Sequence, residues 1–412
     1  MLQILKNYIH FLTALLAVFF YGSKASKMTV IGITGTDGKT STTELLYHIL
    51  LESGKKVSMI STVRAVLGGN EYDTGFHVTT PSPFTLQKYI KKAYELGSRF
   101  LVLEVTSHAL DQARTTGTSI DIAVITNISH EHIDYHKTFE NYKEAKAKIL
   151  KGVKYSILNA DDKNFDYFQK KADGKIITFG LGKKADFTKE SFPFKSTLIG
   201  DFNDYNILAA TAVTKQIGLS DNNIKSAISS FKGVMGRMEE IKTGRNFRIF
   251  LDFAHKINAL ENALETVKKE AKRKVIVVFG SAGLRDVIKR PIMGKIAGKL
   301  ADFTILTAED PRTEDVRTII DQIAKGVSSA GAKELDKSKP IKITDKNKHF
   351  FWRIPDRQEA INFAIRKLAQ AGDVVLITGK GHEKSMCYGT VEYPWSDTEA
   401  IHKALHDNVS KT

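Results

Sequence analysis

Cysteine is almost absent from this sequence. Its 412 residues include a single one, Cys387. One thiol excludes an internal disulfide, and it excludes a zinc site built from several cysteines. A chain of this kind fits a reducing compartment, and we expect it in the cytoplasm.

Two patterns that are typical of nucleic-acid-binding proteins are also missing. The sequence has no arginine-rich tract, and its aromatic residues are not interleaved with basic ones. Lysine and arginine nevertheless outnumber aspartate and glutamate by 61 to 46, which gives a formal net charge of +15. This excess favours acidic partners such as nucleotides, sugar phosphates or an anionic membrane surface. Without the nucleic-acid patterns, we expect phosphorylated small molecules and no nucleic acid.

A glycine-rich stretch near the N-terminus is the most informative motif. The apolar run 28–33 predicts a buried strand, and apolar residues recur at helical spacing after Thr40. A glycine loop between a strand and a helix predicts a phosphate cradle, in which Lys39 reaches the terminal phosphates and Thr40 can bind Mg²⁺. Five residues rather than the usual four separate Gly32 from Gly38, and an ordinary glycine turn is the alternative. The predicted nucleotide contacts are Gly35, Thr36, Asp37, Gly38, Lys39, Thr40 and Ser41.

The apolar run at residues 9–21 precedes this loop. It is similar to the core of a signal peptide, but the predicted phosphate loop follows it closely. The run is also shorter than the roughly 20 residues of a membrane-spanning helix. We therefore expect residues 1–27 to form an apolar helical segment that packs on the protein or lies in a membrane interface. A membrane span is the alternative.

From residue 28 onward, predicted strands alternate with predicted helices, as in parallel α/β sheets. The length allows two or three domains, and we place a boundary near Gly236, between residues 28–236 and residues 237–412. Glycine-flanked strand ends in the second part are typical of a Rossmann-type unit. The predicted strands are 100–105, 122–126, 155–158, 175–179, 249–252, 274–279, 303–306 and 373–377, and two of the predicted helices are 137–150 and 206–217.

Functional groups follow the predicted strands 100–105 and 122–126. Because sites in parallel sheets form at the carboxyl ends of strands, these groups are expected beside the phosphate loop. Glu104 is a candidate Mg²⁺ ligand there, with capping or ion pairing as the alternative. Three histidines, His130, His132 and His136, could form a metal cluster or be ordinary loop residues.

Eleven motifs in register resemble the Mur ligase family, and within it the UDP-N-acetylmuramoyl-tripeptide synthetases. They are GITGTDGKTSTT, TTPSPFTLQ, EVTSHALDQAR, TNISHEHIDYH, YKEAKAKIL, GDFNDYN, GVMGRMEEI, DFAHKINALENAL, KRPIMG, EDPRTED and GKGHE. The resemblance covers residues 28–405. It implies a central P-loop ATPase domain at 28–236 and a Rossmann-like acceptor-binding domain at 237–412. The family's N-terminal uridine-binding domain is missing from this resemblance, and the apolar segment before Met28 stands in its place.

The resemblance implies an ATP-dependent ligase that adds a diamino acid to UDP-N-acetylmuramoyl-L-Ala-D-Glu through an acyl phosphate, in peptidoglycan synthesis. Thr40 and Glu104 would hold one Mg²⁺ and His132 a second. Lys146 matches the family lysine that CO₂ carbamylates, although by composition it is a solvated helix lysine. The implied catalytic residues are Lys39, Glu104, His132 and Lys146, and the implied cofactors are ATP, two Mg²⁺ and the carbamate.

The resemblance also implies contacts to the substrates. Thr79, Thr80, Thr106, Gln112 and Arg114 match positions for the acyl substrate, and Asn203, Asn206, Arg237 and Asp252 match nucleotide contacts. Arg285, Glu309, Asp310, Arg312, Gly379 and Glu383 match positions for the acceptor amine. Arg312 suits the distal carboxylate of meso-diaminopimelate, which lysine lacks. Asp310 replaces a family asparagine, and its negative charge would favour an additional ammonium group. We expect diaminopimelate first and L-lysine next.

Other functions stay open at this point. One is a related amide ligase for another carboxylate, such as a lipid-linked muramoyl substrate, a polyglutamate or a cyanophycin-type chain. Another is a nucleotide-binding partner subunit without ligase activity, although the set of Lys39, Glu104, His132 and Lys146 argues against it. We expect a monomer, with a peripheral membrane contact through residues 1–27 as an open possibility.

Overall fold

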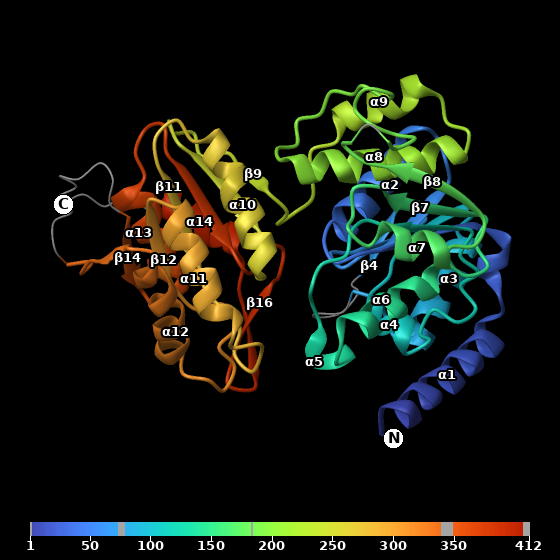
Figure 1. The fold of residues 1–412 in the computed structure, drawn as a ribbon, viewed down its shortest axis with the longest axis horizontal. Coiled ribbons are helices and arrows are strands. Elements are labelled where there is room, and N and C mark those ends of the chain that lie inside the picture. The colour runs from blue at the N-terminus through green and yellow to red at the C-terminus, as the bar shows by residue number, and fades with distance from the viewer. Residues whose placement is uncertain (1, 73–78, 183, 339–348, 407–412) are drawn as a thin grey trace. The chain divides into compact units, whose positions relative to one another are not determined.

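The chain forms two compact units, Met1–Gly233 and Val234–Thr412, which we call the N-terminal and the C-terminal unit. The structure is a computed structural model that describes residues 2–72, 79–182, 184–338 and 349–406 (Figure 1). Met1 and residues 407–412, at the ends of the predicted first and last segments, lie outside the described residues. The functions assigned above to the parts of the chain stay predictions.

An eight-stranded sheet forms the centre of the N-terminal unit. Its order is β4 (Asn70–Tyr72), β3 (Ala65–Leu67), β2 (Val57–Ile60), β5 (Phe100–Glu104), β1 (Thr29–Thr34), β6 (Ile122–Ile125), β7 (Tyr155–Asn159) and β8 (Lys175–Phe179). All neighbours from β2 to β8 are parallel, which confirms the predicted α/β class. The short strands β3 and β4 add an antiparallel edge that the sequence analysis did not predict.

Helices cover both faces of this sheet (Figure 1). One face carries α2 (Lys39–Glu52), α8 (Asp201–Gln216) and α9 (Asp221–Ser230), and the other carries α3 (Pro83–Glu95), α4 (Ser107–Asp111), α6 (Phe139–Ala147) and α7 (Phe165–Lys171). On the second face, strand residues such as Leu101 and Ile125 pack against Leu86, Leu110 and Tyr142, all buried. Strands that are buried on both faces explain the nearly continuous apolar runs in the sequence.

Two helices differ from their predicted bounds. The helix predicted at 137–150 begins at Phe139, because the Thr138 side chain accepts a hydrogen bond from the Asn141 N–H and caps it. It ends in a 3₁₀ turn, Lys148–Leu150. The helix predicted from residue 206 begins at Asp201. Its N-cap is Gly200, whose φ of 89° is a backbone conformation that favours glycine.

The N-terminal segment is the helix α1 (Leu2–Tyr21), followed by a 3₁₀ turn, Lys24–Lys27. The helix packs on α3 through its small residues, and Ala14 and Ala17 are fully buried. Among the described residues, no helix has the length and apolar character needed to cross a membrane.

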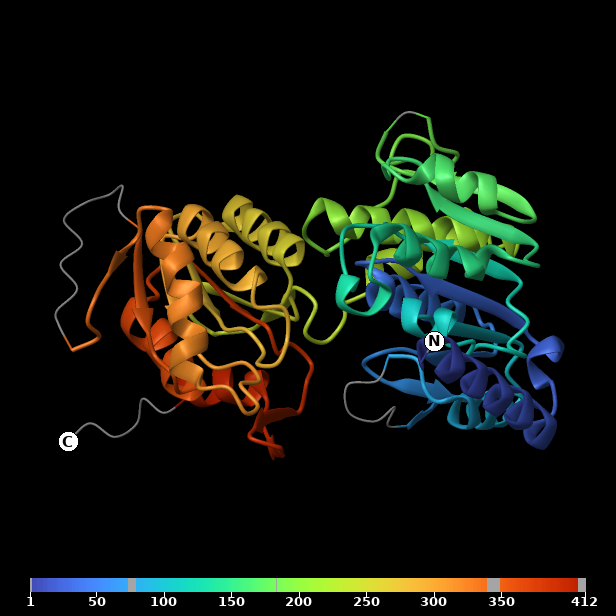
Figure 2. The same cartoon turned by 60° about the horizontal axis from the view of Figure 1, so that its bottom comes forward.

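The C-terminal unit has a seven-stranded sheet. Its order is β13 (Lys333–Glu334), β14 (Phe350–Arg353), β12 (Phe303–Leu306), β11 (Val275–Phe279), β15 (Val374–Thr378), β10 (Arg248–Asp252) and β9 (Glu239–Ile241), and only β9 is antiparallel to its neighbour. One face carries α10 (Ile257–Glu270), α11 (Lys289–Leu300) and α12 (Val316–Ser329), drawn yellow to orange in Figure 2. The other carries α13 (Arg357–Phe363) and α14 (Asp397–His406), and a separate hairpin joins β16 (Ser385–Tyr388) to β17 (Val391–Pro394).

A buried ion pair fixes one end of this second sheet. Arg357 and Asp397 are both fully buried, and the guanidinium Nε and Nη2 lie 2.7 Å from the two carboxylate oxygens. Arg357 also donates to the carbonyl oxygens of Ala308 and Thr378, each at 3.0 Å. These carbonyls follow or end β12 and β15, so the pair connects two strands with α13 and α14.

We expect Arg357→Met to destabilise the C-terminal unit by about 3–5 kcal/mol, because it leaves the Asp397 carboxylate buried without its cation. Arg353→Met is the matched control, since Arg353 is 38% exposed and its ion pairs with Asp321 and Glu334 lie at the surface. It should cost about 1 kcal/mol or less. Both tryptophans of the sequence, Trp352 and Trp395, lie in this unit, so urea unfolding followed by tryptophan fluorescence measures its stability. Equal losses in the two variants would contradict the role of the buried pair.

Candidate active site

The loop between β1 and α2 has the backbone of an anion site. A Cβ on Gly35 would lie 1.8 Å from Thr126 Oγ1, and one on Gly38, whose φ is 79°, would lie 2.4 Å from Asn206 Oδ1. Both positions therefore require glycine. Gly38 is the N-cap of α2, and within the described part of the chain no side chain caps this end. The first N–H groups of the helix are consequently available to a phosphate.

The end of β6 holds this loop in place. Thr126 Oγ1 donates to the carbonyl oxygen of Asp37 at 2.6 Å, and the Asp37 N–H donates to Asn127 Oδ1 at 3.0 Å. The Thr36 N–H donates to the Asn127 carbonyl at 2.8 Å. Lys39 Nζ folds back onto the carbonyls of Gly35 and Thr36, at 3.0 and 2.9 Å. The loop is thus shaped by contacts that exist without any ligand.

Thr40 and Glu104 meet beside the loop, as their places in the sequence predict. Thr40 Oγ1 donates to Glu104 Oε1 at 3.0 Å, and the Thr62 N–H donates to Glu104 Oε2 at 2.9 Å. Thr40 and Glu104 are buried. A hydroxyl and a carboxylate that already lie in contact next to a phosphate site are oxygen donors that fit Mg²⁺. Thr62 is a further residue of this site that the sequence analysis missed.

Lys146 lies on the other side of the same loop. It is 1% exposed, and its Nζ donates to the Gly35 carbonyl at 2.6 Å and to Thr34 Oγ1 at 3.2 Å. The amine lies 4.9 Å from the centre of the Tyr142 ring. The Tyr142 hydroxyl lies 2.9 Å from Thr36 Oγ1, and burial raises the pKa of this phenol. Lys146 is therefore not a solvated helix lysine but part of the wall around the phosphate loop.

The three candidate histidines do not form a metal cluster. In the described ranges, no group of three or more His, Cys, Asp or Glu side chains is arranged to hold a metal ion. His130 stacks on Phe139 at 5.4 Å between ring centres, and His136 Nε2 lies 3.0 Å from Ser107 Oγ. The cluster hypothesis is wrong, because two of its members have other contacts. The His132 ring lies 6.1 Å from the Tyr142 ring and 4.9 Å from the His108 ring, between ring centres.

The residues assigned to the acyl substrate lie together beside Glu104. Thr80 Oγ1 donates to the Glu104 carbonyl at 3.2 Å and accepts the Thr106 N–H at 3.0 Å. Arg114 donates to the Thr80 carbonyl at 3.3 Å and to Gln112 Oε1 at 2.7 Å. Thr79 accepts a hydrogen bond from Thr62 Oγ1 at 3.0 Å. The structure thus connects these five predicted residues to the predicted metal site.

The remaining nucleotide candidates fall into two groups. Asn206 accepts from Thr42 Oγ1 at 3.2 Å and donates to Asn203 Oδ1 at 3.3 Å, directly behind Gly38. In the C-terminal unit, the Arg237 guanidinium lies 4.4 Å above the Phe253 ring. Asp252 accepts the Met238 N–H at 2.7 Å there, and it also accepts the N–H of Ala254. The first group belongs to the phosphate loop, and the second stays a prediction.

Carboxylates gather at the acceptor positions of the C-terminal unit. Lys380 Nζ lies 2.8 Å from Asp310 Oδ1 and 2.6 Å from Glu383 Oε2, so it neutralises much of their charge. Glu309 is buried beside them, and within the described residues its Oε2 has no hydrogen-bond partner. Burial raises the pKa of Glu309, against the opposing fields of Lys289 and Lys380. A buried carboxylate oxygen without a partner is suited to receive an ammonium group.

The loop of Arg312 is held by the β16–β17 hairpin. Arg312 has a φ of 54°, its N–H donates to the Cys387 carbonyl at 3.0 Å, and its carbonyl accepts the Gly389 N–H at 2.7 Å. Asp310 Oδ1 also accepts the Cys387 N–H. Gly379 lies against Glu309, where a Cβ would approach Oε2 to 3.0 Å. Arg285 is exposed on the segment before α11, and its role stays a prediction.

Comparisons with known proteins agree with this geometry. The profile of the Mur ligase middle domain matches residues 33–214, and that of the Mur ligase glutamate ligase domain matches residues 236–381. The chain belongs to the Mur ligase family. It is therefore an ATP-dependent ligase that forms an amide bond between a carboxylate and an amino acid, and its family uses ATP and Mg²⁺.

Among its relatives is the UDP-N-acetylmuramoyl-L-alanyl-D-glutamate–2,6-diaminopimelate ligase of Geobacillus kaustophilus, 37% identical over 96% of this chain and 82% of the relative. The enzyme of the same name from Aquifex aeolicus is 39% identical over 94% of this chain and 79% of its own. A solved structure with that name is 30% identical, with a TM-score of 0.61 over 92% of this chain and 78% of the other. MurF ligase from Thermotoga maritima in complex with ADP, at 18% identity, shares the fold, with a TM-score of 0.67 over 95% of this chain and 83% of the other.

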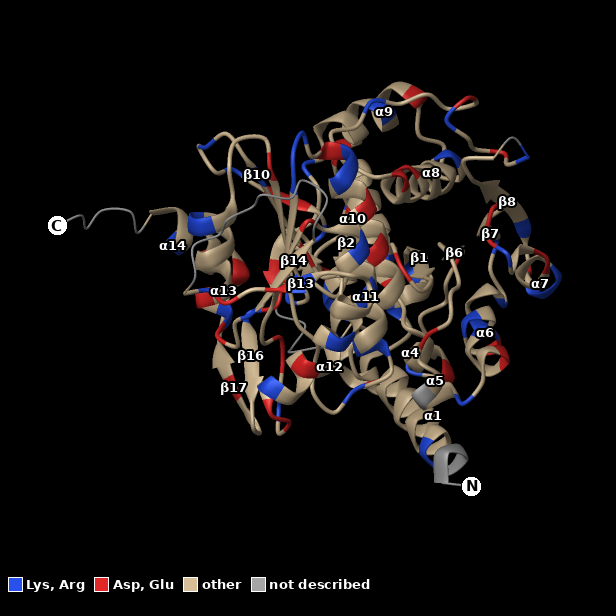
Figure 3. Ribbon diagram, turned by 60° about the vertical axis from the view of Figure 1, so that its left-hand side comes forward, with Lys and Arg blue, Asp and Glu red and all other residues tan. Residues whose placement is uncertain are grey.

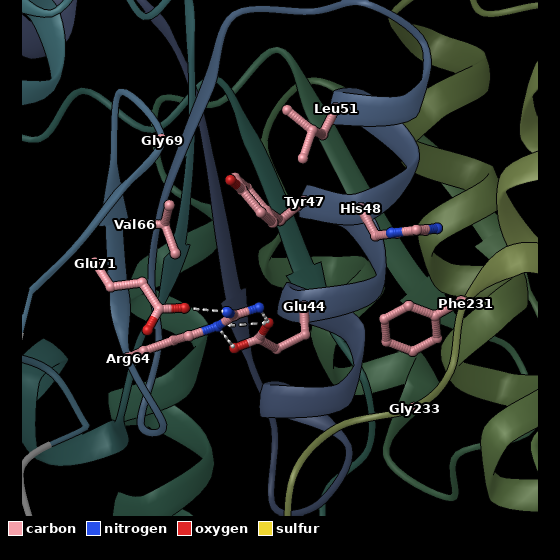
Figure 4. Close-up of a pocket in the computed structure, with 10 residues that line it drawn as sticks. All are labelled: Glu44, Tyr47, His48, Leu51, Arg64, Val66, Gly69, Glu71, Phe231 and Gly233. Carbon is pink, nitrogen blue, oxygen red and sulfur yellow. Dashed lines mark hydrogen bonds and ion pairs between the residues drawn. The ribbon is translucent and has the colours of Figure 1, made fainter.

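This Mur ligase has a further network that leads to Glu104. A hollow of about 280 Å³ is lined by α2, β3, β4 and the segment after α9, and Figure 4 shows Arg64 there between Glu44 and Glu71. Arg64 lies 2.9 Å from the buried Glu44, which also accepts a hydrogen bond from Ser61 Oγ. The Ser61 N–H donates to the Arg64 carbonyl, which closes the turn that carries Thr62. Arg64 therefore positions the N–H that orients the Glu104 carboxylate.

We expect Arg64→Ala to raise the Mg²⁺ concentration for half-maximal activity roughly 10-fold, because groups that orient a metal ligand typically contribute this much to metal affinity. Arg64→Lys should restore part of it. Glu71→Gln is the matched control, since Glu71 pairs with the same guanidinium but is 63% exposed. This variant should leave the Mg²⁺ dependence unchanged. Titration of activity with Mg²⁺ at saturating ATP checks this, and ATP binding confirms that the variants fold. An unchanged Mg²⁺ curve for Arg64→Ala would show that the turn holds Thr62 without Arg64.

Proposed function

We propose that this Mur ligase adds a diamino acid to UDP-N-acetylmuramoyl-L-Ala-D-Glu in peptidoglycan synthesis, with meso-diaminopimelate favoured over L-lysine. The main support is the identity of 37% to a diaminopimelate ligase along 96% of this chain. The preformed phosphate loop beside Thr40, Glu104 and the acyl residues agrees with it.

We also propose that the protein works as a monomer in the cytoplasm and that residues 1–27 contact a membrane peripherally.

The proposed reaction has two steps. A carboxylate oxygen of the acyl substrate attacks the γ-phosphorus of ATP, the bond to the β-phosphate oxygen breaks, and ADP leaves. The resulting acyl phosphate is a much better acyl donor than a carboxylate. The neutral amine of the diamino acid then attacks the carbonyl carbon, the carbon–oxygen bond to phosphate breaks, and phosphate and a proton are released.

The residues of the N-terminal unit have distinct parts in this proposal. The N–H groups of the loop and Lys39 bind the triphosphate, and Arg114 binds a carboxylate of the acyl substrate. Thr40 and Glu104 would hold one Mg²⁺, and His132 with a carbamate on Lys146 would hold a second. Such ions neutralise the negative charges of the γ-phosphate and the incoming carboxylate, which otherwise repel each other. The Tyr142 ring lies 6.1 Å from the His132 ring and 4.9 Å from Lys146 Nζ, so it is close to both residues beside the loop.

In the C-terminal unit, we propose that the acceptor is recognised by Glu309 and Arg312. The Asp310 carboxylate was expected to attract an additional ammonium group, but Lys380 already neutralises it. Glu309 is the better candidate, since its Oε2 is buried and lacks a partner among the described residues. Arg312, fixed by the hairpin, would bind the distal carboxylate that distinguishes diaminopimelate from lysine. Arg285, Gly379 and Glu383 complete the proposed acceptor set.

The second candidate is an amide ligase for another carboxylate, with lipid-linked muramoyl, polyglutamate and cyanophycin-type chains as the options. It keeps the same chemistry and differs only in the acyl donor. The third, a nucleotide-binding subunit without ligase activity, is disfavoured by the intact contacts of Lys39, Thr40 and Glu104.

Phosphate release from ATP should require both UDP-N-acetylmuramoyl-L-Ala-D-Glu and meso-diaminopimelate, and the product should gain the mass of one diaminopimelate. Arg312→Ala should raise the KM for diaminopimelate at least about 10-fold, because a charge-assisted contact of this kind contributes about 1.5–3 kcal/mol. Arg317→Ala, at an exposed arginine of the next helix, is the control. Release with lysine only would reverse the acceptor assignment. ATP binding without release for any amine would favour another acyl donor or the subunit without activity.

Lys146→Ala should abolish turnover, and added short carboxylates should restore part of it, since they can replace the oxygen atoms of the proposed carbamate. Lys151→Ala, five residues along and 59% exposed in a surface ion pair with Asp173, is the control and should keep full activity. Phosphate release with and without acetate or formate measures both effects. Full activity of Lys146→Ala without any additive would remove Lys146 from the mechanism.

A further inference from the structure

The helix α1 turns its small side chains toward the protein and its large apolar side chains outward. Ala14 and Ala17 are fully buried against the protein, whereas eight large apolar residues remain exposed, from 39% for Phe11 to 84% for Phe19. We call these eight the outer face of α1; they are Tyr8, Ile9, Phe11, Leu12, Leu15, Leu16, Phe19 and Phe20. Single exposed apolar residues are common, but a continuous group of this size indicates an interaction surface.

The neighbouring helix α3 extends this surface. Phe84 is 37% exposed, and its ring lies 6.1 Å from the Phe20 ring and 6.4 Å from the Tyr21 ring. At about 1.5 Å per residue, the stretch from Tyr8 to Phe20 is roughly 18 Å long. The surface is therefore a long apolar strip with an aromatic cluster of Phe19, Phe20 and Phe84 at one end.

Basic residues, and no free acidic ones among residues 1–28, lie near the strip. Residues 1–28 contain no aspartate or glutamate, and α1 carries no acidic residue in Figure 3. Lys6 and Lys27 are exposed near the two ends of α1. Lys88, one helical turn after Phe84 on α3, is exposed as well. The nearby Asp111 is bound within the protein, by Asn7 Nδ2 at 3.0 Å and by Lys148 Nζ at 3.1 Å.

We propose that the outer face of α1, together with Phe84, docks on the surface of an anionic lipid bilayer. A helix with an apolar face and basic residues beside it binds in the plane of a membrane interface, where apolar side chains enter the acyl region and lysines meet anionic headgroups. A second copy of this chain is a poorer partner, because it would bring the lysines of two copies together around a shared apolar contact. An anionic bilayer is thus the partner of the membrane contact proposed above for residues 1–27.

The strip lies next to the loop that carries the predicted acyl-substrate residues. Asn7 donates to Asp111, and Asp111 accepts a hydrogen bond from the Tyr135 hydroxyl, which in turn accepts one from Gln112. Val18 packs against Gly117, where an added Cβ would lie 2.3 Å from its side chain. A docked α1 would thus hold the Gln112–Arg114 loop near the lipid surface. This consequence, unlike the docking, depends on the acyl-substrate roles proposed above for Gln112 and Arg114.

Sedimentation of the full-length protein with vesicles tests the docking. We expect binding to phosphatidylcholine vesicles that contain phosphatidylglycerol, weaker binding at high salt, and little binding to phosphatidylcholine alone. Phe19→Ser/Phe20→Ser should weaken binding at least about 10-fold, because each phenylalanine loses its transfer to the acyl region. Ile288→Ser/Val391→Ser is the matched control, since these residues of the C-terminal unit are 75% and 52% exposed. This control should bind like the unaltered protein.

Several results would overturn the docking. These are no binding of the unaltered protein to either vesicle, equal binding of the Phe19/Phe20 variant, or equal binding to neutral vesicles. A dimer in solution that the Phe19/Phe20 variant dissociates, without vesicle binding, would assign the strip to a second copy. Ligase activity with the soluble UDP-linked donor, measured without lipid, separates this outcome from a failure of the proposed function, because the variant should retain it.

Discussion

The close approach of the phosphate loop to the end of β6 is the constraint on which the N-terminal unit depends. Gly35 lies where a methyl group would overlap Thr126, and Thr126 and Asn127 bind the backbone of residues 36 and 37. This contact exists because β6 lies directly beside β1 in the sheet, with β5 on the other side. The strand order therefore brings together the loop, Glu104 and the segment of His132, although they are far apart in the sequence.

Much of this arrangement could be predicted from the sequence. The strands β1, β5 and β6 are apolar runs, and each is followed by polar groups, so the local pattern indicates both the strand and its functional end. The contact between Thr40 and Glu104 then follows from the rule that parallel strands present their carboxyl ends at one edge. The family assignment followed from short motifs in register, because these motifs are the loops that form the site.

Other features could not be predicted, because they depend on distant contacts. Arg64 and Tyr142 gave no local signal of a function; Tyr142 is important because its ring lies close to both His132 and Lys146. The strands β3 and β4 have three residues each, too few for a clear period. The hairpin strand β17 is exposed throughout and lacks an apolar pattern. The charge of Asp310 suggested a free anion, but Lys380, 70 positions away, neutralises it in the fold.

The two lysines at the phosphate loop have a consequence for the order of binding. The Nζ atoms of Lys39 and Lys146 both donate to the carbonyl oxygen of Gly35, at 3.0 and 2.6 Å. Before Lys146 is carbamylated, two ammonium groups on one oxygen create a positive potential that attracts an anion and repels a bare divalent cation. Mg²⁺ should therefore enter this site together with the triphosphate rather than before it. With both lysines protonated, the loop thus favours the metal–nucleotide complex over the separate metal ion.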